Sequence, residues 1–398
     1  MAETPLRIFL IVGEPSGDQL GAHIMAAIVR QAARNGQTVE FSGLGGEAMA
    51  EQGLRSLFPI SDLAIFGLVE VIPHAPRIFR RVRETVAAIR ACKPDVVLSI
   101  DVPAFAFRVL QQFKHDGAPL VHCVAPTVWA WRPGRAKMIA GLLDHLLALL
   151  PFEPPYFERV GLSTTFIGHP IVEAGLDAAD GVGFRARHGI APDDDLLCVL
   201  PGSRRSEVAR LLPIFGETLQ RLAARLPNLR VVVPTVAHVA DSVRAAVAAW
   251  PVPAVVVMGN AEKFAAFKAS KAALAASGTV VLELAVAGCP TVMAYQVSGL
   301  TAWIVRRMVK VQHASLPNLI LGRELLPEFL QERCNPEALS DAVSHLLLDE
   351  DARRAQIEGG AEVARRLGAG GAPPSDIAAK VVLDHAGRYH ARDEGERA

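Results

Sequence analysis

Short apolar runs alternate with longer amphipathic segments along most of the chain. Residues 7–12, 96–98 and 120–124 are predominantly apolar, as are strands covered on both faces of a parallel sheet. Residues 19–33 have the apolar spacing of an amphipathic helix. Strands and helices that alternate in this way predict an α/β fold of the Rossmann type, with parallel strands.

The same strand-and-helix scheme occurs twice. Further strands are expected at residues 39–42, 145–150 and 165–167, and then at 196–200, 229–233, 254–258, 272–275 and 290–295. A chain of 398 residues is long for one core, and residues 177–195 have the low apolar content of a linker. We therefore predict two Rossmann-like domains facing a central cleft, at residues 1–176 and 177–335. Residues 336–398 form a predicted helical tail, and whether this tail packs back on the first domain is left open.

Charge and cysteine content narrow the range of partners. The chain has 41 basic and 41 acidic side chains, so its formal net charge is zero, which argues against nucleic acid as a partner. The five cysteines are scattered, and no pair has the spacing of metal ligands. We expect reduced thiols in a cytoplasmic protein and no metal site.

No segment has the pattern of a membrane anchor. The N-terminus lacks the basic-then-apolar order of a signal peptide. Residues 284–305 contain no charged side chain and are long enough to span a bilayer, but Gly288, Pro290 and Gly299 interrupt them. We expect no transmembrane span.

Asp101 follows directly after an apolar strand. The strand cannot continue through Pro103, which has no amide hydrogen to donate to a sheet ladder. The aspartate should therefore lie at the carboxyl edge of the sheet, where open α/β folds bind their ligands. A carboxylate that is desolvated from behind has a raised pKa and is suited to act as a base. The alternative role is a cap for the helix that begins near Phe105.

A glycine-containing turn at residues 13–18 joins the first strand to the first helix. Such a turn can approach a ligand closely and offers backbone amides. Glu14 and Asp18 disfavour a phosphate here and suit sugar hydroxyls. Ser16 or Asp18 could instead cap the helix.

A loop after another predicted strand combines aromatic and basic side chains. It contains Trp129, Trp131 and Arg132. Exposed ring faces beside an arginine are typical of carbohydrate or lipid contact.

The turn at residues 201–207 has the features of an anion site. It offers amides at the start of a helix, the Ser203 hydroxyl and the Arg204 guanidinium. Gly202, Ser203 and Arg204 are therefore predicted to hold a phosphate. The alternative is a helix cap with exposed arginines.

A second turn in this half, Ser277–Gly278–Thr279, opens a helix that contains Glu283. The neighbours of Glu283 are apolar, and an acid without a partner would be costly among them. Such an acid commonly accepts from the two ribose hydroxyls of a nucleotide. Further along the chain, Asn318 is the one amide in an apolar loop.

One apolar stretch, residues 63–72, is followed by four arginines within residues 77–83. Its apolar members include Phe66, Leu68, Val69 and Ile72. The pattern fits a membrane-contact patch, and it also fits a core helix with a solvated basic face. Residues 303–310 are a second stretch of this character.

Six segments together resemble the lipid-A-disaccharide synthase family. They are Gly-Glu-Pro-Ser-Gly-Asp at 13–18, Ile-Asp-Val-Pro at 100–103, Val-Trp-Ala-Trp-Arg at 128–132, Leu-Pro-Gly-Ser-Arg at 200–204, Ala-Ser-Gly-Thr at 276–279 and Ser-Leu-Pro-Asn-Leu at 315–319. The resemblance runs from about residue 8 to residue 334. Pro15 departs from the family pattern, in which threonine is common, and the tail after Pro336 carries no motif.

This resemblance implies a metal-independent, inverting glycosyltransferase of the two-Rossmann (GT-B) type that needs no cofactor. The implied donor is UDP-2,3-diacylglucosamine and the implied acceptor is 2,3-diacylglucosamine 1-phosphate (lipid X). The products would be a β-1,6-linked disaccharide 1-phosphate and UDP. The implied location is cytoplasmic, peripheral on the inner face of the cytoplasmic membrane, and a homo-oligomer is left open.

The implied residue roles agree with the chemistry of the side chains. Inversion needs a base on the acceptor 6-hydroxyl, and Asp101 is the candidate. Arg204 and the loop amides would hold the diphosphate, Glu283 the ribose, and Asn318 the nucleotide or its phosphates. The acceptor half would contribute Glu14, Ser16 and Asp18. No Asp-x-Asp follows a strand to hold magnesium, so Arg204 and the adjacent helix start would replace that charge.

Two other classes of protein are kept as alternatives. An epimerase acting on a sugar nucleotide would need an acid–base pair across the sugar, without lipid-sized apolar loops. A non-catalytic lipid-binding protein would have no use for the anion-binding turn. A dehydrogenase is disfavoured because neither half carries a dinucleotide fingerprint.

Overall fold

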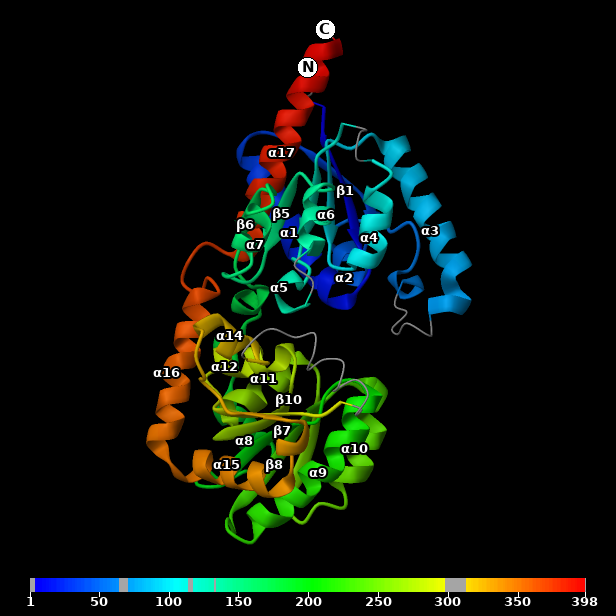
Figure 1. Ribbon diagram of the computed structural model, residues 1–398. Helices are drawn as coiled ribbons and strands as arrows, with labels where there is room; N and C mark the ends of the chain where they lie inside the picture. The colour runs from blue at the N-terminus through cyan, green and yellow to red at the C-terminus, as the bar shows by residue number, and fades with distance from the viewer. Residues whose placement is uncertain (1–3, 64–70, 114–116, 132–133, 298–312, 398) are drawn as a thin grey trace. The chain divides into compact units, whose positions relative to one another are not determined.

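The computed structural model describes residues 4–63, 71–113, 117–131, 134–297 and 313–397, and it confirms the predicted α/β class (Figure 1). The chain forms two compact units, Met1–Pro170 with Gly370–Ala398, and Ile171–Ala369. Each unit is built on one six-stranded sheet. All neighbouring strands in both sheets are parallel.

The sheet of the first unit has the strand order β2-β1-β3-β4-β5-β6. Its strands are β1 (Leu6–Val12), β2 (Val39–Leu44), β3 (Val96–Ile100), β4 (Leu120–Cys123), β5 (His145–Ala148) and β6 (Thr164–Phe166). Its helices are α1 (Pro15–Arg34), α2 (Glu47–Glu51), α3 (Val71–Cys92), α4 (Pro103–Leu110), α5 (Val128–Trp131), α6 (Gly134–Ala140), α7 (Pro154–Glu158) and α17 (Pro374–Arg397).

Helices cover both faces of this first sheet. Successive side chains of β1 point to opposite faces, so Leu10 packs with α1 and α17 while Phe9 packs with α3 and α4. Figure 1 shows α17 alongside α1. Arg30 of α1 pairs with Asp376 of α17, with Nη2 2.9 Å from Oδ1. The C-terminal helix therefore forms part of the core of the first unit.

The sheet of the second unit has the strand order β12-β11-β10-β7-β8-β9. Its strands are β7 (Asp195–Leu200), β8 (Leu229–Thr235), β9 (Ala254–Met258), β10 (Ala272–Ala276), β11 (Thr291–Tyr295) and β12 (Glu328–Leu330). Its helices are α8 (Gly181–Arg187), α9 (Arg205–Ala223), α10 (Ala240–Val247), α11 (Asn260–Ala269), α12 (Thr279–Ala287), α14 (Leu316–Leu321), α15 (Pro336–Leu348) and α16 (Glu350–Arg366).

The segment 336–398, predicted as one tail, is divided between the two units. Helix α15 packs on α9 and α16 packs on α12, both in the second unit, whereas α17 belongs to the first. The units divide after Pro170, and the sequence placed this boundary at residue 176. The tail carries no motif that would indicate its packing partners. Each of its helices packs where the rest of the fold leaves an apolar surface uncovered, and the sequence of the tail does not show where that is.

Within the described ranges, no helix combines the length and the apolar character that a bilayer crossing requires. The uncharged segment 284–305 covers the end of α12 and then β11, and residues 298–305 lie outside the described part. All five cysteines are free thiols, and all except Cys92 are buried.

Candidate functional site

The second unit has a cavity of about 430 Å³ at the carboxyl edge of its sheet. Strands β7, β8 and β10 end here and helices α9 and α12 begin here, the position at which open α/β sheets bind ligands. The lining residues are Leu200, Gly202, Ser203, Arg204, Glu207, Pro234, Thr235, Val236, Lys263, Ala276, Ser277, Gly278, Thr279, Val280 and Glu283. The two turns and the helical acid selected from the sequence therefore meet in one cavity.

The loop between β7 and α9 requires a glycine at position 202. Gly202 has a φ of +109°, in the region that favours glycine, and a Cβ there would lie 2.9 Å from Glu207 Oε2. His238 Nε2 lies 2.6 Å from the Ser203 carbonyl oxygen, which ties the loop to the segment after β8. The loop is thus held in a conformation that only glycine at position 202 accommodates.

Arg204 is the N-cap residue of α9 and contacts the first turn of that helix. Its Nη1 donates to Glu207 Oε1 at 2.7 Å, and its backbone amide donates to Glu207 Oε2 at 3.4 Å. The side chain of Arg204 is nevertheless 73% exposed. Glu207 therefore orients the guanidinium and leaves most of its donors accessible to an anion.

Glu283 has a partner that the sequence did not reveal. Lys263 Nζ of α11 lies 2.8 Å from Glu283 Oε2, close enough for an ion pair but without the alignment of a hydrogen bond. This pair explains how an acid is tolerated among apolar neighbours. No local pattern pointed to Lys263, because the approach of α11 to α12 depends on the strand order of the sheet.

Thr235, at the end of β8, is a second lining residue that the sequence analysis missed. Its Oγ1 is buried and has no hydrogen-bond partner in the part of the chain that the structure describes. Buried hydroxyls are normally paired, so an unpaired one in a cavity wall is suited to a ligand.

Asn318, which is predicted to touch the nucleotide or its phosphates, is held by hydrogen bonds within the protein. It is fully buried, and its Oδ1 accepts from the amides of Leu325 at 2.8 Å and Leu326 at 3.1 Å. Its Nδ2 donates to the Leu326 carbonyl at 2.9 Å and to Glu328 Oε1 at 2.8 Å. Every hydrogen-bonding position of this amide is used, so Asn318 fixes the turn between α14 and β12.

In the first unit, Asp101 follows β3 on a strained piece of backbone. Asp101 and Val102 have φ of +56° and +43°, and a left-handed conformation costs roughly 1–3 kcal/mol at a residue other than glycine. The cap position of α4 is occupied by Val102, so the structure does not support the alternative role of Asp101 as a helix cap. The strain holds the aspartate at the edge of the sheet.

The Asp101 carboxylate is only partly engaged by the protein. Its Oδ1 accepts from the Val102 amide at 2.9 Å, while Oδ2 has no hydrogen bond to the described residues. Burial raises the pKa of this carboxyl group. A partly exposed carboxylate with a raised pKa and an available oxygen is suited to accept a proton.

The turn after β1 lies beside Asp101. A Cβ on Gly13 would come within 3.0 Å of Val102 Cγ1, so the side chain next to Asp101 packs closely on the backbone of this turn. Glu14 stands at the N-cap position of α1 and is half-buried, and Ser16 is exposed in the first turn of the helix. The structure therefore places Glu14 and Ser16 at the same sheet edge as Asp101.

Asp18, which is predicted as a substrate ligand of the acceptor half, is held by hydrogen bonds within the protein. Its side chain is buried and accepts from three amides at the start of α2: Gly46 at 2.7 Å, Ala48 at 3.0 Å and Met49 at 3.2 Å. Asp18 thus caps α2 and not its own helix. The two segments lie far apart in sequence, so no local pattern could show this contact.

The loop after β4 contacts a buried acid that the sequence analysis did not select. Trp129 Nε1 donates to Glu153 Oε1 at 3.4 Å, and the indole meets the Phe152 ring edge-on at 5.2 Å between centroids. The Leu150 amide donates to Glu153 Oε2 at 3.0 Å. Burial raises the pKa of Glu153 to about 7. Arg132 and the side chain of Trp131 lie outside the described part of the structure.

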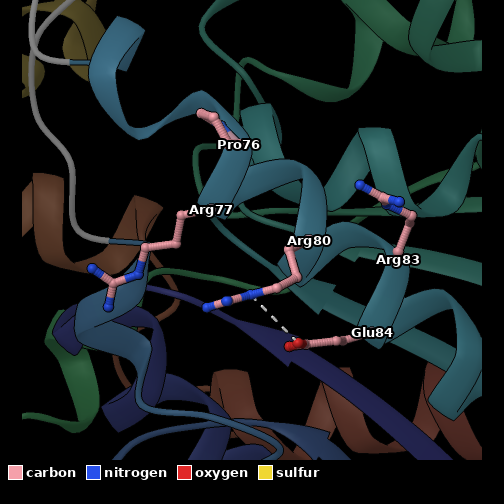
Figure 2. A pocket seen from close by; sticks show the side chains of 5 residues that line it. All are labelled: Pro76, Arg77, Arg80, Arg83 and Glu84. Carbon is pink, nitrogen blue, oxygen red and sulfur yellow. Dashed lines mark ion pairs between the residues drawn. The ribbon is translucent and has the colours of Figure 1, made fainter.

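Three arginines of α3, Arg77, Arg80 and Arg83, line a hollow of about 630 Å³ with Pro76 and Glu84 (Figure 2). Arg80 Nε lies 3.6 Å from Glu84 Oε1, the ion pair dashed in the picture, whereas Arg77 pairs with the buried Asp62. The predicted membrane residues Phe66, Leu68 and Val69, the side chain of Ile72 and the stretch 303–310 lie outside the described part of the structure.

Across the described ranges, no group of His, Cys, Asp or Glu side chains is arranged to hold a metal ion. The positive charge at the cavity of the second unit comes from Arg204, from Lys263 and from the start of α9.

Solved structures share this fold over nearly the whole chain. A UDP-GlcNAc 2-epimerase from Neisseria meningitidis, bound to UDP-GlcNAc, has a TM-score of 0.62 and 11% identity and covers 95% of this chain and 99% of its own. MurG from Acinetobacter baumannii has a TM-score of 0.58 and 13% identity, and the match covers 96% of this chain and 100% of the MurG chain. At these identities the likeness shows the GT-B fold alone.

Sequence relatives are much closer. The lipid-A-disaccharide synthase of Rhodospirillum centenum is 58% identical over 382 residues, which are 96% of this chain and 94% of that protein. The synthase of Paramagnetospirillum magneticum is 49% identical over 381 residues, 95% of this chain and 97% of its own. The family model for lipid-A-disaccharide synthetase matches residues 8–370. The chain therefore belongs to the lipid-A-disaccharide synthetase family and is a glycosyltransferase of lipid A synthesis.

Proposed function

We propose that the protein transfers 2,3-diacylglucosamine from UDP-2,3-diacylglucosamine to the 6-hydroxyl of lipid X, with inversion at the anomeric carbon. The products are the β-1,6-linked disaccharide 1-phosphate and UDP. Membership of the family supports disaccharide synthesis. The observation that carries the finer proposal is Asp101, a partly exposed carboxylate with a raised pKa at the ligand-binding edge of the sheet.

Asp101 acts as the base in this proposal. Its Oδ2 accepts the proton of the 6-hydroxyl while the hydroxyl oxygen forms its bond to C1 of the donor sugar. The bond between C1 and the diphosphate oxygen breaks on the opposite face, and its electron pair leaves with UDP. One such displacement inverts the configuration at C1.

The cavity of the second unit holds UDP in this proposal. Arg204 and the amides at the start of α9 bind the diphosphate and compensate the negative charge that develops on it. Glu283 accepts from the ribose hydroxyls, and Lys263 balances its charge. Thr235 offers its unpaired hydroxyl to the same ligand. We propose that these groups support the reaction without a divalent ion.

We also propose that the protein meets its lipid substrates as a peripheral protein on the inner face of the cytoplasmic membrane. Both substrates carry acyl chains, which hold them in a bilayer. Arg80 and Arg83 on α3 are exposed, and an arginine near an anionic surface contributes about 1 kcal/mol. The apolar residues 66–72 precede these arginines in the sequence.

Incubation with both lipid sugars tests the proposal. We expect UDP and a disaccharide 1-phosphate to form in equal amounts, only when both substrates are present, and at the same rate with a chelator. Release of UDP without lipid X, or conversion of the donor to an isomeric sugar nucleotide, would overturn it.

A further inference from the structure

Glu153 is a buried carboxyl group to which the proposed reaction gives no role. Its side chain is only slightly accessible, so it cannot itself touch a sugar. A carboxyl in an apolar environment is costly unless its oxygens are paired. Glu153 meets this cost with two donors, the Trp129 indole and the Leu150 amide. It thus links the end of β5 to the loop that follows β4.

The Trp129 indole is held by two contacts in the loop that follows β4. The nitrogen edge of the indole is taken by Glu153, and Phe152 meets the indole with an interplanar angle of 88°. These two contacts fix the plane of the ring. The residue remains partly exposed, and a partly exposed indole whose plane is fixed is suited to contact an apolar or sugar surface.

The loop that carries Trp129 lies at the same edge of the first sheet as Asp101. The Asp101 amide donates to the Cys123 carbonyl at 3.0 Å, and the Val124 amide donates to the Leu147 carbonyl at 3.1 Å. The edge therefore runs without a break from Asp101 across the end of β4 to the end of β5. Burial is the main cause that raises the pKa of the Cys123 thiol to about 12, and the charges of Asp101 and Glu153 add to this shift.

We propose that Trp129 is a wall of the acceptor-sugar subsite beside Asp101, and that Glu153 is the positioning residue that orients its indole. The proposal rests on the transfer to lipid X proposed above, and it adds the pair of residues that recognises the acceptor. The ligand class is a hexose with an apolar ring face and acyl substituents. A planar indole matches such a ring, and loss of its orientation weakens acceptor binding more than it slows bond formation.

Two conservative variants and their combination test this proposal. Trp129→Phe keeps an aromatic ring but removes the indole N–H. Glu153→Gln keeps the side-chain volume, but its amide nitrogen then faces either the Trp129 indole N–H or the Leu150 amide, which both need an acceptor. Each should raise the KM for lipid X by about threefold to tenfold and lower kcat by less than that. Because both substitutions break the same hydrogen bond between Trp129 and Glu153, the double variant should have a KM for lipid X only slightly above that of either single variant. Glu158→Gln, on the exposed side of α7, is the matched control and should leave both constants unchanged.

The readouts separate this proposal from the proposed function. Transfer to lipid X by the parent protein tests the function alone, and calorimetric binding of lipid X to each variant tests the subsite even without turnover. UDP affinity should be unchanged in all variants. An unchanged KM and affinity for lipid X in both single variants would overturn the proposal. Strictly additive effects in the double variant, or a parent that does not bind lipid X, would overturn it as well.

Discussion

At the scale of single residues, Arg204 and Arg205 are a matched pair for testing the phosphate site. Both are exposed arginines at the start of α9, but only Arg204 lines the cavity. Glu207 holds the planar guanidinium of Arg204, which in our proposal binds two phosphate oxygens at once, and an ammonium cannot replace it in that role. Arg204→Lys should therefore weaken UDP binding about tenfold, and Arg205→Lys less than twofold, by calorimetry. Equal UDP affinity in the parent and the Arg204 variant would remove Arg204 from the site.

Glu153 gives the protein a pH dependence whose sign is unusual for an acid. Its pKa is raised from 4.5 to about 7 by burial, so between these values the folded protein keeps a proton that the unfolded chain has lost. The stability of the fold therefore decreases as pH rises through this range, by up to about 3 kcal/mol. Glu153→Gln lacks this dependence.

The difference in unfolding free energy between the Glu153→Gln variant and the parent isolates this effect, because all other groups titrate in both. We expect the unfolding free energy of the variant to increase relative to that of the parent as pH rises from about 5 to about 8. The Glu158→Gln control should show a difference that is flat with pH. A flat difference for the Glu153→Gln variant would mean that this carboxyl titrates normally.

At the scale of elements, the sequence predicted the location of residues that directly follow a strand. It did not predict hydrogen bonds between a side chain and the backbone of another turn. Asp101 and the turns at 201–207 and 277–279 follow apolar strands directly, so their place at a sheet edge could be predicted. Asp18 and Asn318 accept hydrogen bonds from backbone amides of other residues, and the local sequence pattern did not indicate these contacts. A polar residue in an apolar context indicates a partner, but it does not tell whether the partner is a ligand or the protein itself.

The contact between Asp18 and α2 gives a prediction at this scale. Asp18→Ala leaves three amides of the α2 start without their acceptor, so the free energy of unfolding should fall by about 1–3 kcal/mol. Urea denaturation measures the change, and Gln19→Ala, at an exposed position of α1, should stay within about 0.5 kcal/mol of the parent. Unchanged stability together with lost affinity for lipid X would return Asp18 to the substrate ligands.

At the scale of the whole molecule, two repeats of the strand-and-helix scheme were enough to predict two α/β halves. The packing partners of α15, α16 and α17 could not be predicted in the same way. The apolar residues of α17 pack with α1, β1 and β3, and nothing in the sequence of α17 alone indicates which sheet it covers. Lys263 was missed for a related reason, since its neighbour Glu283 is brought to it by the order of strands.

Membrane contact is the prediction that involves the protein as a whole. If residues 66–72 insert into the bilayer and the arginines of α3 meet its phosphates, the protein should sediment partly with anionic vesicles, and high salt should release most of it. Changing Phe66 and Leu68 together to serine should lower vesicle binding and lipid turnover in parallel, without changing UDP affinity. If neither binding nor turnover changes, these side chains are packed inside the protein and membrane contact lies elsewhere.

The most direct measurement of the central claim is turnover by Asp101→Asn. The amide keeps the size of the carboxylate and can still accept from the Val102 amide, but it cannot take a proton from the acceptor hydroxyl. We expect disaccharide formation to fall by roughly 10²–10⁴-fold, with the circular dichroism spectrum and UDP affinity of the parent. Turnover within a few-fold of the parent would contradict the assignment of Asp101 as the base.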